Sequence, residues 1–133
     1  RNGYFDEESV QQSASEWIQD VAPPVRIEIA GWLAFFPDKR EVALNRLVKD
    51  LEHPDWAVAL RACRAIELLG PKAKSVLATM KKLYAKTRYE PGDNNFFIAF
   101  SSGAFLDRLG EKTEPWDFSP GAGSFMPAKK KSN

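Results

Sequence analysis

The side chains that could support catalysis in this 133-residue chain are few and far apart. His53 is the only histidine, and a histidine can serve as a general base or as a metal ligand. Either role needs partner groups, and the neighbouring Pro54 and Asp55 do not supply a ligand set or a triad. We therefore interpret His53 as a turn residue.

The remaining reactive groups give no better site. Cys63 is the only cysteine, which excludes an intramolecular disulfide and a cysteine-based zinc site. It lies inside an apolar helical pattern, whereas a nucleophile needs exposure and an activating base, so we interpret it as a small apolar filler. Carboxylates such as Glu67 and Asp107 are scattered along helices and not paired across a cleft, which argues against a glycosidase. We expect no catalytic residues, no cofactor, no metal ligand and no enzymatic activity of this chain alone.

Charge and hydropathy restrict the partners that the chain could have. The formal net charge is +1, and residues 1–110 carry 15 basic and 15 acidic groups. This neutral body predicts no nucleic-acid binding, and the terminal run Lys129 to Lys131 is interpreted as a solvated charge run. No apolar segment approaches the ~20 residues of a membrane span, so no membrane partner is expected. The chain begins at Arg1 without a signal-peptide pattern, which suggests a piece of a longer protein.

Apolar residues recur at helical spacing along most of the chain. Acidic residues 6–8 precede the first pattern, Pro23 and Pro24 end it, and Gly70-Pro71 ends the clearest one. The expected helices span about residues 7–21, 24–36, 42–51, 55–70, 72–85 and 95–109. We predict a lead-in over residues 1–6, one helical domain over residues 7–110 and an irregular tail over residues 111–133.

The same helical unit occurs more than once. An offset of 33 residues aligns seven apolar pairs, among them Leu33 with Ile66 and Leu44 with Leu77. An offset of 40 aligns Ile66 with Leu106 and Leu69-Gly70 with Leu109-Gly110, so residues 86–95 hold an insertion of seven residues. Repeated helical pairs that bury their apolar stripes on each other are typical of α-solenoids. The sequence therefore predicts an all-α, right-handed α-α superhelix of about three helical pairs.

These repeats resemble HEAT repeats, which are armadillo-like helical pairs with a Pro-x-Val-Arg type of entry and a Leu-Gly exit. Residues 23–26 match the entry, whereas Ala59 replaces the arginine of the next unit, which puts a repeat-bridging ion pair there in doubt. The runs at residues 53–58, 64–74 and 94–98 are similar to the C-terminal HEAT region of some bacterial sulfatases. The similarity covers about residues 20–111. It implies a sulfatase-like parent hydrolase, periplasmic or secreted, although Cys63 does not fit the Cys-x-Pro-x-Arg signature of such enzymes.

We consequently expect a protein-interaction role, either as an accessory module packed on a catalytic domain or as a free-standing adaptor; a nucleic-acid-binding HEAT-like module is a weaker alternative. Trp17, Trp32 and Trp56 are interpreted mainly as packing residues. Terminal repeats expose apolar surface, and arginine and tyrosine are favoured at interfaces. The candidate contact residues are Arg88 and Tyr89 in the insertion, Trp17 in the first helix, and Phe96 and Phe97 in the last.

Overall fold

A computed structural model of the chain describes residues 7–17, 22–89 and 93–113, and these residues are helical with short connections. The predicted all-α class is confirmed for this part of the chain. The elements are α1 (Glu7–Trp17), α2 (Pro23–Leu33), α3 (Arg40–Asp50), α4 (Trp56–Leu69), a 3₁₀ helix η1 (Gly70–Val76), α5 (Leu77–Thr87) and α6 (Asp93–Arg108).

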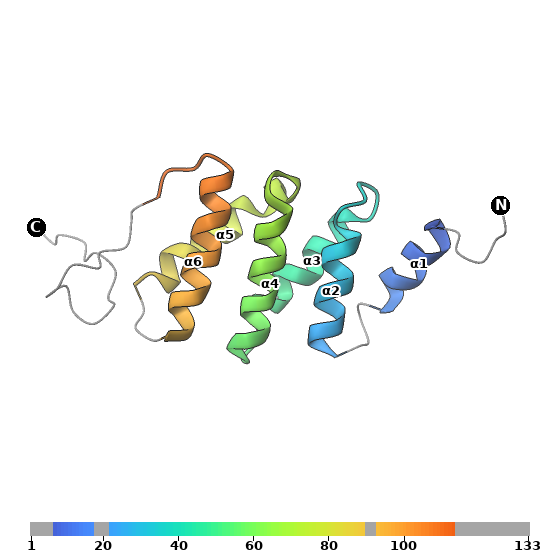
Figure 1. Cartoon of the computed structure of the whole chain (residues 1–133), viewed down its shortest axis with the longest axis horizontal. Helices are drawn as coiled ribbons and strands as arrows, with labels where there is room; N and C mark the ends of the chain where they lie inside the picture. Colours follow the sequence, from blue (N-terminus) through green and yellow to red (C-terminus); the bar gives the residue numbers. More distant parts are fainter. Residues whose placement is uncertain (1–6, 18–21, 90–92, 114–133) are drawn as a thin grey trace, which may run out of the picture.

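The helices form two layers (Figure 1). In the first layer α2, α4 and α6 lie side by side, with α4 in the middle. The second layer holds α3, which packs against α2 and α4, and α5, which packs against α6. Helix α1 packs against α2 at the N-terminal end of this arrangement. The three first-layer helices therefore share one face that the second layer does not cover.

The connection between α4 and α5 differs from the prediction. Residues 72–76 were expected to begin the second helix of the central pair, but they belong to η1, which is interrupted at Ala73 (φ −98°, ψ 24°). The bend at Ala73 divides η1 into two short turns, so α5 begins only at Leu77. As a result α5 packs mainly on α6, and α4 packs mainly on α2, α3 and α6.

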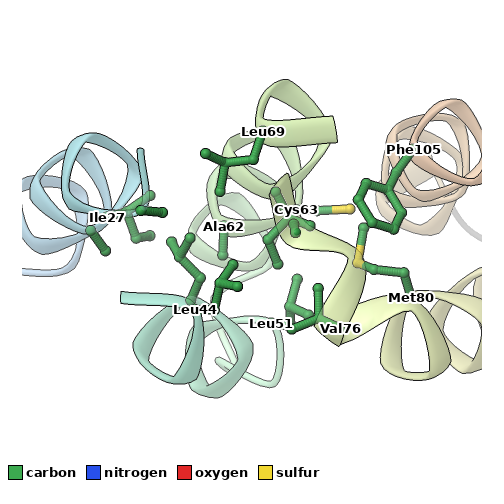
Figure 2. Packing of buried hydrophobic residues seen from close by; sticks show 14 of the residues in the cluster. Ile27, Leu44, Leu51, Ala62, Cys63, Leu69, Val76, Met80 and Phe105 are labelled. Carbon is green, nitrogen blue, oxygen red and sulfur yellow. The ribbon is translucent and has the colours of Figure 1, made fainter. Parts of the chain in front are cut away.

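A hydrophobic core contains buried residues from every one of these helices. Leu33, Ile66 and Leu106 occupy equivalent repeat positions in α2, α4 and α6, and all three are at most 1% exposed. Figure 2 shows Cys63 of α4, Met80 of α5 and Phe105 of α6 pointing toward one another. Through such contacts, the core joins the two layers even where the helix backbones are not adjacent.

Two arginines stabilise the C-terminal ends of first-layer helices. Arg40 Nε donates to the carbonyl oxygen of Ala34 at 2.7 Å, just after α2. Arg108 of α6 donates from Nη1 to the carbonyl oxygen of Glu67 at 2.6 Å, in the last turn of α4. A cation at this position satisfies a free carbonyl and interacts favourably with the helix dipole. Gly70 makes the second contact possible, because a Cβ there would lie 2.9 Å from Arg108 Nη2.

We therefore expect Gly70→Ala to lower the free energy of unfolding by about 1 to 3 kcal/mol, because it combines a positive φ of 56° with displacement of Arg108. Gly110→Ala is the matched control: its φ is 77° but its Cβ would meet nothing within 4 Å, so only the backbone cost of about 1 kcal/mol applies. Urea unfolding of both variants makes the comparison. Equal losses would show that the Arg108 contact contributes nothing.

A buried ion cluster joins α2 to α3. Asp50 is 1% exposed, and it accepts hydrogen bonds from Arg26 Nε at 3.0 Å and from Arg46 Nη2 at 3.3 Å. Burial alone would raise the pKa of Asp50, but the bonds from the two arginines outweigh it and hold that pKa below its ordinary value of 3.8. The cluster therefore stabilises the fold above pH 3.8, and this stabilisation is lost as the pH falls through the folded-state pKa.

The next repeat lacks this cluster altogether. At the offset of 33 residues, Arg26 corresponds to Ala59, Arg46 to Thr79 and Asp50 to Leu83. All three members have been replaced together, so no charge is left buried without its partners. Replacement of a whole buried ion cluster by apolar residues is often neutral, whereas loss of one member is costly.

We expect the members of this ion cluster to be energetically coupled in the first repeat. Arg26→Ala and Asp50→Leu should each destabilise the chain, but the double variant should lose about 1 to 3 kcal/mol less than the sum of the single losses. A double-mutant cycle in urea measures this coupling. The exposed pair Lys81–Glu111, whose atoms are 2.6 Å apart, is the control and should couple by about 0.5 kcal/mol or less. Strict additivity for Arg26 and Asp50 would contradict the account.

Candidate functional site

The exposed apolar side chains of the described residues concentrate on one face. Nine large hydrophobic residues are exposed among the described residues, and six of them line a single groove on the first layer. The five aromatic residues that are exposed within the described ranges are all in this group. We call this feature the aromatic groove. Its six large apolar residues are Trp32, Phe35, Trp56, Leu68, Phe97 and Phe100.

The aromatic groove crosses all three first-layer helices and has a volume of about 1110 Å³. Helix α2 and the turn after it contribute Trp32 and Phe35 to one side, and α6 contributes Phe97 and Phe100 to the other. Helix α4 lies between them, where small residues such as Ala57 leave room for a ligand. The groove is therefore bordered by aromatic rings on two helices and has the middle helix as its floor.

The aromatic rings are held by contacts with one another. Trp56 and Phe97 stack across α4 and α6, with ring centroids 6.4 Å apart and planes at 19°. Phe96 makes edge contacts with Phe97 at 5.7 Å and with Phe100 at 4.7 Å. Such contacts restrict the rings, so they would lose little conformational freedom when a ligand covers them.

The floor of the groove also carries charge. Glu67 accepts a hydrogen bond from Ser101 Oγ at 2.8 Å, and Arg64 Nη1 lies 3.4 Å from its Oε1. Lys72 lies over the Phe35 ring, with its Nζ 5.6 Å from the ring centroid. Arg61, in contrast, is exposed and has no hydrogen-bond or ion-pair partner among the described residues. A ligand would therefore meet the unpaired guanidinium of Arg61 between the two aromatic sides of the groove.

The predicted contact residues differ in their exposure and in their place in the structure. Phe97 is half exposed and lines the aromatic groove, and the ring of Phe96 packs edge-on against it. The side chain of Trp17 lies outside the described part of the chain. Arg88 is only 2% exposed, with its guanidinium 4.4 Å from the Tyr89 ring centroid, so it is not the surface residue that the prediction assumed. The reason is that α5 extends to Thr87 and draws Arg88 into the protein interior.

His53 and Cys63, the two residues considered for catalysis, lie in surroundings that indicate structural roles. His53 Nδ1 accepts a hydrogen bond from the backbone N–H of Asp55 at 3.0 Å, which agrees with its interpretation as a turn residue. Cys63 is fully buried, and burial raises the pKa of its thiol to about 12. Among the described residues, no three histidine, cysteine or carboxylate side chains gather closely enough to hold a metal ion. None of the described helices has the length and apolar character needed to cross a membrane.

Sequence reasoning missed most of the groove. Trp32 and Trp56 were assigned to packing, yet each is 41% exposed, and Phe35 and Phe100 were not singled out as contact residues. The available signal was that α2 and α6 carry large apolar residues around their circumference instead of along one stripe. In a helix covered on one side only, such a pattern leaves large apolar residues exposed.

Comparison with known proteins adds no assignment: no family model, curated protein or solved structure matches this chain. The resemblance to HEAT repeats and to sulfatase C-terminal regions therefore stays a prediction from the sequence.

We expect Cys63 to be unreactive in the folded protein, because it is buried and its pKa of about 12 leaves almost no thiolate near neutral pH. Ellman's reagent at pH 8 should release about one equivalent of thionitrobenzoate in denaturant and only a small fraction of this within minutes under native conditions. Rapid stoichiometric reaction of the native protein would refute this description of the site.

Proposed function

We propose that this chain is a non-catalytic, HEAT-like helical-repeat module that binds a segment of another protein in the aromatic groove. The observation that carries the proposal is the concentration of exposed aromatic side chains on one face of α2, α4 and α6. Large exposed apolar patches are uncommon on proteins that have no partner, and they often mark interaction sites. Tryptophan, in addition, is one of the residues that dominate binding energy at protein interfaces.

The repeats support the HEAT-like part of the proposal. Equivalent positions in α2, α4 and α6 are buried in the same way, as Leu33, Ile66 and Leu106 illustrate. Gly70 and Gly110, which are equivalent at the offset of 40 residues, both have positive φ. Together with the two layers, these equivalences favour a superhelix of about three helical pairs, for which we propose the right-handed twist predicted from the sequence. In such an architecture, one layer of helices presents an extended surface to a partner.

The wider context of the module follows from the sequence resemblance alone. It suggests that the chain is the C-terminal part of a bacterial sulfatase-like hydrolase, in which the partner would be another domain of the same protein. A free-standing adaptor with a separate partner is the alternative. The aromatic groove would serve as the docking surface in both cases, and the chain itself would supply no catalytic group.

A random peptide library displayed on phage, selected against the whole chain, tests this proposal. We expect selected peptides to bind the groove, so Trp32→Ala and Phe97→Ala should each weaken their affinity by about tenfold or more. Ala57→Glu provides a second variant that leaves the core intact, because Ala57 is exposed on the groove floor. Val42→Ala is the matched control: Val42 is 45% exposed but lies on α3, outside the groove.

Circular dichroism must show that each variant keeps its helical signal. The proposal fails if no peptide is enriched, or if the selected peptides bind the groove variants as tightly as they bind the Val42→Ala control.

A further inference from the structure

We propose, building on the function above, that the partner segment carries an aspartate or glutamate between two large apolar side chains. The two apolar side chains would pack on the two aromatic sides of the groove. The carboxylate would pair with Arg61 on α4. The distribution of charge and aromatic surface in the groove indicates this chemistry of the partner.

One charge of the groove, that of Arg61, favours a carboxylate on the partner. The charged side chains that line it are Glu28, Arg61, Arg64 and Glu67. Glu67 is occupied by Arg64 and Ser101, whereas Arg61 has no partner within the described residues. Lys72, over the Phe35 ring, adds a further positive charge beside the groove. Glu28, like Arg61, has no ion-pair or hydrogen-bond partner among the described residues, so a carboxylate beside Arg61 would pair one of the two charges that the chain leaves open.

The position of Arg61 places the carboxylate in the middle of the segment. Residues 57, 61 and 68 lie on the outward side of α4 at spacings of four and seven residues, and all three line the groove. Arg61 is near the middle of the groove-lining residues of α4, which fall between positions 56 and 68. Trp32 and Phe35 lie on α2 and the turn after it, and Phe97 and Phe100 lie on α6. Neighbouring helices pack about 8 to 10 Å apart, so the two aromatic sides are roughly 16 to 20 Å from each other.

Glu28 sets a further requirement on the partner. It is exposed on α2 at the border of the groove, so an acidic side chain near the α2 end would be repelled. A lysine or arginine at the centre would instead meet Arg61. The charge pattern thus disfavours a uniformly acidic segment, and it favours a carboxylate at the centre with any basic side chain on the α2 side.

The experiment compares a selected peptide with the same peptide in which the acidic residue is replaced by its amide. On the unmodified chain, the change from glutamate to glutamine, or from aspartate to asparagine, should weaken binding by about fivefold, which corresponds to about 1 kcal/mol. On Arg61→Gln the two peptides should bind equally. Lys82→Met, an exposed lysine of α5 outside the groove, is the matched control and should keep the fivefold difference.

The outcomes separate this inference from the function on which it rests. Peptides that need Trp32 and Phe97 but show no dependence on a carboxylate, or the same dependence with Arg61→Gln, would overturn the acidic partner and leave the docking surface standing. Peptides that do not need Trp32 or Phe97 would overturn both. Sedimentation equilibrium of the chain alone completes the test, since self-association abolished by Phe97→Ala would identify a second copy as the occupant and refute the acidic segment.

Discussion

The structure depends on the burial of a shared apolar stripe, because its helices of 11 to 16 residues are too short to be stable alone. Leu33, Ile66 and Leu106 show how the first-layer helices bury the same side against the second layer. A helix that packs on one side leaves its other side in solvent. The large aromatic residues on that other side of α2, α4 and α6 therefore remain exposed, and the aromatic groove is a direct consequence of the packing.

The two central repeats satisfy the same structural requirement with different chemistry. Arg26 and Asp50 connect α2 to α3 through a buried ion pair, whereas the equivalent positions hold Ala59 and Leu83. The paired replacement avoids a buried charge without a partner, which would cost more than either solution. The sequence alone had already put an ion pair in the second unit in doubt, because Ala59 replaces the arginine there. Only the structure identifies Asp50 as the partner of Arg26, since their contact depends on how α2 and α3 cross.

The helices and the repeat were predictable because their apolar periodicity is local. Leu33, Ile66 and Leu106, which the sequence offsets align, are all buried. The start of α5 was not predictable, since Lys72 to Val76 fit a helical pattern and the bend at the buried Ala73 appears only in the structure. The site was harder still. Periodicity cannot tell whether a tryptophan such as Trp32 packs in the core or borders a groove, because that depends on which side of the helix a neighbouring layer covers.

The most direct test of this account is the ¹⁵N chemical-shift map of the chain with a bound groove-selected peptide. The account predicts perturbations on the outward side of α2, α4 and α6, including the indole N–H signals of Trp32 and Trp56, and little change on α3 and α5. Perturbations centred on α3 and α5, with both indole signals unchanged, would contradict it.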